Sequence, residues 1–132
     1  MIGILGVTAI AVSGCGGSTG TFKNNPRPPE PINVTGSINN ARVLISPTSF
    51  GAGPIDLRVT NAASQSVSLT VRSESGQAIA NLQSINPDTP GEVKFDITPG
   101  SYIVTASQLG IRPATLRVGK ERPSAASAVL QP

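Results

Sequence analysis

The sequence predicts an all-β protein whose folded part is a single Greek-key β-sandwich of about seven to eight strands. Three observations predict this fold. Apolar residues recur with a period of about two rather than 3.6, turns containing Gly and Pro separate the apolar runs, and no window of about ten residues has an amphipathic helix pattern. The sandwich is expected over residues 32–132, because a chain of about 100 residues buries enough surface to fold on its own.

The strongest strand patterns lie at 55–60, 67–72 and 93–98, where apolar and polar residues alternate. Alternation places the apolar side chains on one face of a sheet and the polar ones on the other, as a half-buried strand requires. Weaker candidates are 42–46, 77–82, 102–107 and 114–118, with an edge strand at 125–130. The core is expected to be aliphatic, with Phe50, Phe95 and Tyr102 as its large anchors.

Turn-forming residues occupy the gaps between these runs. Residues 73–76 read Ser-Glu-Ser-Gly and predict a turn that joins two strands. The dipeptides Pro90-Gly91 and Pro99-Gly100 each predict a type II turn, because proline fixes φ at the second position and glycine accepts a positive φ at the third. The charged stretch at 119–122 is interpreted as a further, solvated turn.

The composition excludes several kinds of chemistry. The 132 residues include no His, one Cys and one Met, and the net charge is +3. Without His there is no imidazole for general base catalysis or metal binding. A single Cys forms neither an internal disulfide nor a thiolate cluster for zinc or iron–sulfur. We therefore expect no enzyme activity, no metal, no other cofactor and no small-molecule substrate, and the sparse basic residues do not predict nucleic-acid binding.

An uncharged apolar run opens the chain, from Ile2 to Val12. Up to Gly14 it has about thirteen residues, whereas a membrane-spanning helix needs about 20, so it is typical of the apolar core of a secretory signal. The run ends in Val12-Ser13-Gly14-Cys15, which resembles the lipobox of bacterial lipoproteins. The resemblance implies cleavage before Cys15, where the small residues Ser13 and Gly14 fit a protease cleft, and attachment of diacylglycerol to the Cys15 thiol.

The lipoprotein resemblance divides the chain into a signal peptide at 1–14, an acylated Cys15 with a Gly- and Pro-rich tether at 15–31, and the sandwich at 32–132. The tether is expected to be flexible near its glycines and stiffer near its prolines. Fatty acyl chains, such as palmitate, give stable attachment when more than one is present. The implied location is extracytoplasmic and membrane-anchored, at the cell surface or on the periplasmic face.

A second motif lies inside the sandwich. An extended strand ends at Asn61, and a later strand at 92–97 runs into Thr-Pro-Gly-Ser-Tyr at 98–102. Over residues 40–120 this order resembles the cupredoxin family. The Pro-Gly-Ser-Tyr turn also occurs in transthyretin-like and carboxypeptidase-regulatory-like sandwiches, so it indicates a cupredoxin-like or immunoglobulin-like sandwich more firmly than it indicates one family.

The cupredoxin resemblance implies a copper site, but the ligands are missing. Cupredoxins bind copper with two His, one Cys and usually a weak axial Met. The resemblance places them after Asn61 and in the loop after the Pro-Gly-Ser-Tyr turn. That loop has Ala106 near the expected Cys, and Ile111, Arg112 and Leu116 fill the stretch expected to hold His and Met. None of these side chains binds copper, so the resemblance implies the fold without its metal.

Together these features predict a non-catalytic, lipid-anchored extracytoplasmic module that displays a binding or structural surface at the cell envelope. Its expected partners are membrane lipid, through acylated Cys15, and an envelope protein or glycan. Two alternatives remain open: a metal or redox carrier that uses the cupredoxin fold, and a carbohydrate-binding domain.

Overall fold

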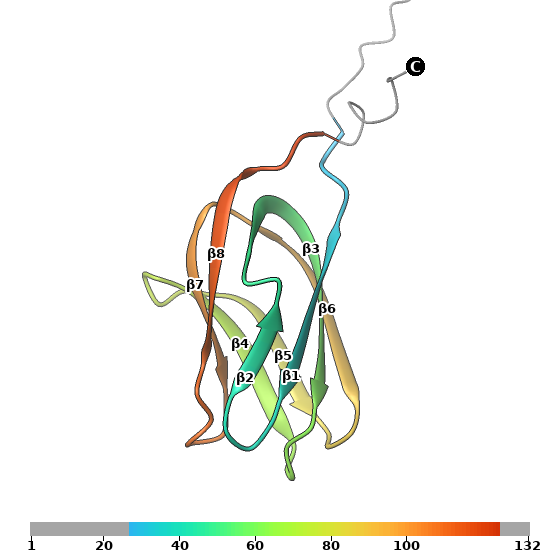
Figure 1. Ribbon diagram of the computed structural model, residues 1–132, viewed down its shortest axis with the longest axis vertical. Coiled ribbons are helices and arrows are strands. Elements are labelled where there is room, and N and C mark those ends of the chain that lie inside the picture. The colour runs from blue at the N-terminus through green and yellow to red at the C-terminus, as the bar shows by residue number, and fades with distance from the viewer. Residues whose placement is uncertain (1–26, 125–132) are drawn as a thin grey trace, which may run out of the picture.

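The computed structural model describes residues 27–124, in which eight β-strands form the domain (Figure 1). In chain order the strands are β1 (Ile32–Ile38), β2 (Val43–Ser46), β3 (Ser49–Asn61), β4 (Val67–Ser73), β5 (Ala78–Ile85), β6 (Pro90–Ile97), β7 (Gly100–Ala106) and β8 (Ala114–Glu121). No helix occurs between residues 27 and 124, and a membrane-spanning helix is therefore not found there. The all-β prediction is confirmed, while the expected strand at 125–130 lies outside the described residues.

The strands form two sheets that share β3. Residues 53–61 of β3 pair with β1 and β6, and β2 extends this first sheet beyond β1. Residues 49–52 of β3 pair with β8, and β7, β4 and β5 complete the second sheet. The β1–β3 and β3–β8 pairs are parallel and the others are antiparallel. The two sheets pack face to face around a common core, which confirms the predicted sandwich (Figure 1).

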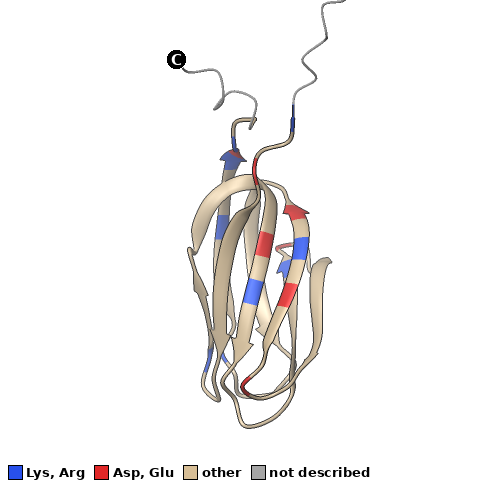
Figure 2. Ribbon diagram, turned by 90° about the vertical axis from the view of Figure 1, so that its right-hand side faces the viewer, with Lys and Arg blue, Asp and Glu red and all other residues tan. Residues whose placement is uncertain are grey.

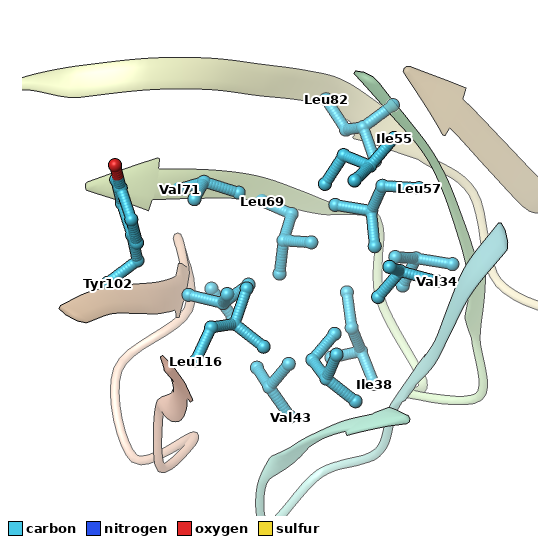
Figure 3. Packing of buried hydrophobic residues seen from close by; sticks show 14 of the residues in the cluster. Val34, Ile38, Val43, Ile55, Leu57, Leu69, Val71, Leu82, Tyr102 and Leu116 are labelled. Atoms are coloured by element: carbon cyan, nitrogen blue, oxygen red, sulfur yellow. The ribbon is translucent and has the colours of Figure 1, made fainter. Parts of the chain in front are cut away.

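Aliphatic side chains from both sheets fill the space between them (Figure 3). The strict alternation at 55–60 is confirmed, because Ile55, Leu57 and Val59 point inward and are at most 1% exposed. The opposing sheet contributes the alternating residues of β4, namely Val67, Leu69 and Val71, each 1% exposed. Burial of a side chain of this size contributes about 1.5–3 kcal/mol, so the alternating strands supply much of the stability.

Of the three expected aromatic anchors, only Tyr102 lies fully within the core, at 4% exposure. Phe50 and Phe95 are partly buried and pack against the margin of the core. Phe95 sits on β6, which among the described strands pairs with β3 alone and so forms an edge of the first sheet. The Tyr102 hydroxyl donates a 2.7 Å hydrogen bond to the Thr98 backbone oxygen, like a tyrosine corner, and so the polar tip of the buried ring is satisfied.

The predicted hairpin at 73–76 is confirmed, since the Gly76 amide donates to the Ser73 oxygen at 2.9 Å. The turn predicted at Pro90-Gly91 is wrong, because both residues belong to β6. A side chain at Gly91 would lie 3.1 Å from the Ile85 side chain, so glycine is there for packing between neighbouring strands. The chain reverses instead at 86–89, and Asp88 adopts the positive φ, at 60°.

The second expected type II turn, Pro99-Gly100, is also corrected. Gly100 has a φ of 151°, far from the value of about 80° at the third position of a type II turn. It already belongs to β7, where it pairs with Val118. The connection from β6 to β7 therefore consists of Thr98 and Pro99 alone. The hydrogen bond from Tyr102 to Thr98 spans it.

Two strand segments were not expected from the alternation pattern. In β1 the inward positions are interrupted by Gly36, where a Cβ would lie 2.7 Å from the Ile45 side chain. The first part of β3, residues 49–54, contains two glycines and a proline, which weaken any strand pattern. In both segments close packing requires glycine, and the glycines interrupt the alternation of apolar and polar residues that would otherwise indicate a strand.

Arg122 stabilises the point at which β3 leaves one sheet and enters the other. Gly53 adopts a φ of 137° there, and a Cβ on it would lie 2.7 Å from the Arg122 guanidinium. Backbone oxygens that are removed from water need hydrogen-bond donors, and a strand that changes sheets interrupts the regular ladder. The Arg122 side chain donates to the oxygens of Gly51 (3.1 Å), Ala52 (3.3 Å), Pro54 and Glu30 (2.5 Å).

The interpretation of 119–122 as a solvated turn is therefore wrong. Residues 119–121 continue β8. Arg122 lies next to the crossing of β3, and its backbone amide donates to the Ala52 oxygen at 2.9 Å. The bond from its side chain to Glu30 also ties the end of the tether to the domain, close to the buried Pro29.

Replacing Arg122 with Gln is expected to lower the free energy of unfolding by about 2–3 kcal/mol, because several partly buried backbone oxygens lose a charged donor. Urea denaturation followed by circular dichroism measures the change. The matched control is Lys120→Gln, an exposed cation two residues earlier, with an expected change below about 0.5 kcal/mol. Equal stability of the two variants would contradict the role of Arg122.

Candidate functional site

The loops that could form a site gather at one end of the sandwich. We call this the distal end: the four connections at 39–42, 62–66, 86–89 and 107–113. The chain enters β1 and leaves β8 at the opposite end, which we call the tether end and define by residues 27–31 and 122–124 (Figure 1). The two ends are separated by the length of the strands, roughly 25 Å for the part of β3 from Gly53 to Asn61.

Asn61 organises the distal end from within. Its side chain is fully buried, at 0% exposure, and makes three hydrogen bonds. The amide nitrogen donates to the oxygens of Gln65 and Ile85, each at 2.8 Å, and the amide oxygen accepts from the Ala63 amide at 2.9 Å. The Asn61 backbone oxygen also accepts from the Asp88 amide at 2.7 Å. One residue thus fixes the loop after β3 and the loop after β5 in a single arrangement.

Side-chain amides and hydroxyls connect the remaining loops. The Asn39 oxygen accepts hydrogen bonds from two successive amides, those of Ala41 and Arg42, at 2.8 Å each. The Asn40 oxygen accepts from the Ser64 amide at 3.2 Å. Gln108 donates to Gln65 at 3.0 Å and Ser66 donates to Asn86 at 2.8 Å. Because each bond joins parts of the chain that lie far apart or closes a tight turn, the distal loops are held in place before any partner binds.

The structure places most of the positions to which the cupredoxin resemblance assigns copper ligands in the apolar core. Ala106 and Ile111 are buried, at 7% and 8% exposure, and belong to the apolar core. Leu116 lies within β8 and pairs with Tyr102, whereas Arg112 is exposed on the surface. Between residues 27 and 124 no group of three or more His, Cys, Asp or Glu side chains is placed to hold a metal ion. The lipobox residues Val12, Ser13, Gly14 and Cys15 lie outside the described residues.

Among the described residues, the ion pairs lie on the neighbouring strands β3 and β6 of the first sheet, where basic and acidic residues alternate along the ribbon (Figure 2). Arg58 lies 3.2 Å from Asp56 and 3.7 Å from Glu92, and Lys94 lies 3.5 Å from Glu92. Asp56 is only 6% exposed, and its Oδ1 has no hydrogen-bond partner in the described part of the chain. The Arg58 guanidinium therefore provides the main compensation for this buried carboxylate.

Two exposed features of the distal end were not singled out from the sequence. Arg42 lies beside Arg112, and Leu109 is 99% exposed at the tip of its loop. The only signal in the sequence is an isolated apolar residue between Gln108 and Gly110, which resembles the many surface leucines that have no function. The proximity of the two arginines depends on loop geometry, which has no local sequence pattern.

Comparison with known proteins supports the fold. The chain is similar to the structure of auracyanin B, with 16% sequence identity, coverage of 71% of this chain and 99% of that one, and a TM-score of 0.55. It is also similar to the dithionite-reduced auracyanin of the photosynthetic bacterium Roseiflexus castenholzii, with 13% identity, coverage of 67% and 95%, and a TM-score of 0.50. No protein-family model matches the chain, and no curated protein sequence matches it significantly. The domain therefore has a cupredoxin-like fold, a conclusion that concerns architecture alone.

Replacing Asn61 with Ala is expected to lower the free energy of unfolding by about 3 kcal/mol, because two backbone oxygens and one amide lose their partner in a buried place. Thermal and urea denaturation measure the loss. The matched control is Asn81→Ala, since Asn81 is exposed and donates one hydrogen bond, to Thr70. A loss no larger than that of the control would show that Asn61 does not organise the distal loops.

Proposed function

We propose that this protein is a non-catalytic, lipid-anchored module that displays the distal loops away from the extracytoplasmic face of a membrane. The observation that carries the proposal is the separation of the two ends. The chain coming from Cys15 enters at the tether end, where the Arg122 side chain holds the Glu30 oxygen and Pro29 is buried. An anchor at Cys15 therefore leaves the organised loops of the opposite end free to meet a partner.

The length of the tether fits this role. About thirteen residues separate Cys15 from the buried Pro29, and a flexible chain of that length spans about 20 Å. The domain adds roughly 25 Å between its two ends. The distal loops would therefore stand beyond the lipid headgroups, within reach of other components of the envelope.

A display role agrees with the chemistry of the distal end. The whole sequence contains no His, and the amide side chains of Asn39, Asn61 and Gln108 are engaged in hydrogen bonds that shape the loops. Amide and hydroxyl groups do not titrate near neutral pH, and the four distal connections contain one carboxylate, that of Asp88, so they hold no pair of groups for general acid–base catalysis. A fixed shape with exposed loop side chains suits recognition, and we propose no catalytic residue and no cofactor.

Replacing Cys15 with Ala is expected to abolish acylation and release the protein from the membrane fraction, because the diacylglycerol has no thiol to join. Cell fractionation and metabolic labelling with a fatty acid measure both effects. The matched control is Ser18→Ala, three residues further along the tether, which should remain acylated and membrane-bound. Retention of the Cys15→Ala variant in the membrane, without labelling, would contradict the anchor.

A second candidate function is a metal or redox carrier, which is consistent with the cupredoxin-like fold. The available ligands argue against this function, because the chain has no His and its one Cys, Cys15, lies outside the sandwich. Titration of the purified chain with Cu(I) and Cu(II), followed by equilibrium dialysis, is expected to show no stoichiometric, tight binding. Tight uptake of one copper per chain would replace the display proposal with the carrier function.

A further inference from the structure

Two arginines lie side by side at the distal end. Arg42 and Arg112 form an isolated parallel bridge, in which the Arg112 amide donates to the Ala41 oxygen at 2.9 Å and the Val43 amide donates to the Arg112 oxygen at 2.8 Å. Paired residues of parallel neighbours direct their side chains to the same side, with their Cα atoms about 5 Å apart. The backbone therefore presents two guanidinium groups together, and the Asn39 side chain fixes the loop that carries Arg42.

Within residues 27–124 neither guanidinium has an acidic partner. Both residues are exposed, and across residues 27–124 the ion pairs join Arg58 and Lys94 to acids of the first sheet, with none at Arg42 or Arg112. No side-chain hydrogen bond from Arg42 or Arg112 is found in that part of the chain either. Like charges held next to each other are unfavourable in the isolated protein, so binding of an anionic group relieves the repulsion.

An exposed leucine lies on the same loop as Arg112. Leu109 is 99% exposed, although the loop around it is well held. On one side Gln108 bonds to Gln65 and Ser107 exchanges hydrogen bonds with Ser68, and on the other side Ile111 is buried. The loop thus presents an apolar side chain to solvent on a fixed support, where it contributes nothing to the core.

We propose that Arg42, Arg112 and Leu109 form a docking surface for an acidic segment of a second protein, in which carboxylates flank an apolar side chain. The two arginines bind the carboxylates, and Leu109 contacts the apolar residue. This inference rests on the proposed display role, because it names the class of partner that the distal loops meet.

A protein partner fits these residues better than a polyanion or a lipid surface does. A phosphate-rich polymer is usually bound by a track of many cations, whereas this surface has two and adds an apolar residue that such a polymer does not need. A single leucine, on the same connection as one of the two arginines, buries too little apolar area to hold a membrane surface. Carboxylates beside an apolar side chain match both the charge and the apolar contact.

The test uses the full-length chain purified in detergent and a fluorescent peptide with the sequence Asp-Glu-Leu-Glu-Asp, followed by anisotropy. We expect saturable binding that weakens as salt is raised. The double variant Arg42→Gln/Arg112→Gln should weaken binding by about tenfold or more, and Leu109→Ser should weaken it as well. The matched control is Arg72→Gln/Arg117→Gln, which removes the same charge from strands β4 and β8 of the second sheet and should change affinity less than about twofold.

Three results would overturn the proposal. These are the absence of saturable peptide binding, an equal loss in the control variant, and equal or tighter binding of polyphosphate or of the peptide with Ser in place of Leu. All variants change exposed side chains, and their urea midpoints show whether each one is folded. The peptide-binding assay does not depend on Cys15. A negative result in that assay therefore leaves the proposed anchor untouched, and membrane retention of Cys15→Ala leaves the docking surface untouched.

Discussion

The structure depends on one feature of the backbone: at Gly53, strand β3 leaves the second sheet and enters the first. A single strand that belongs to both sheets fixes how they face each other, and so determines which side chains meet in the core. At the crossing the Arg122 guanidinium donates hydrogen bonds to the backbone oxygens of Gly51, Ala52 and Pro54 at once. The side chain that stabilises the crossing also donates to the Glu30 oxygen, so one residue connects the crossing to the segment that leads into β1.

The central strands could be predicted from the sequence, because there the burial of alternate residues is the dominant constraint. This holds for β4 and for the part of β3 around Leu57, where the apolar residues at alternate positions are all buried in the core. Some segments were missed where glycine packs closely against a neighbour, such as Gly36 in β1, whereas residues 119–121 of β8 were missed because their charges indicated a turn. From the sequence alone, a glycine that is needed because a neighbouring side chain leaves no room cannot be distinguished from a glycine that forms a turn.

The distal end was predictable only in outline. Asn61 stands out at the end of a strand pattern. Its side chain makes three hydrogen bonds with backbone groups, and these partners do not depend on residue type, so the sequence does not identify them. The pairing of Arg42 with Arg112 arises from two loops that are about 70 residues apart and meet only in the folded chain. The absence of copper ligands, by contrast, was plain from the composition, because it needs no geometry.

The parallel pairing of β1 with β3 has a mechanical consequence. Seven residue pairs connect the two strands, from Ile32–Ile55 to Ile38–Asn61, and the tether leads directly into β1. If the proposed anchor pulls on the start of β1 while a partner holds the loop that follows β3, the force passes from one strand to the other. The ladder of hydrogen bonds between the two strands is then loaded in shear, all at once, instead of opening one bond at a time from an end. Under the proposed function, this pairing therefore resists tension between the anchor and that loop.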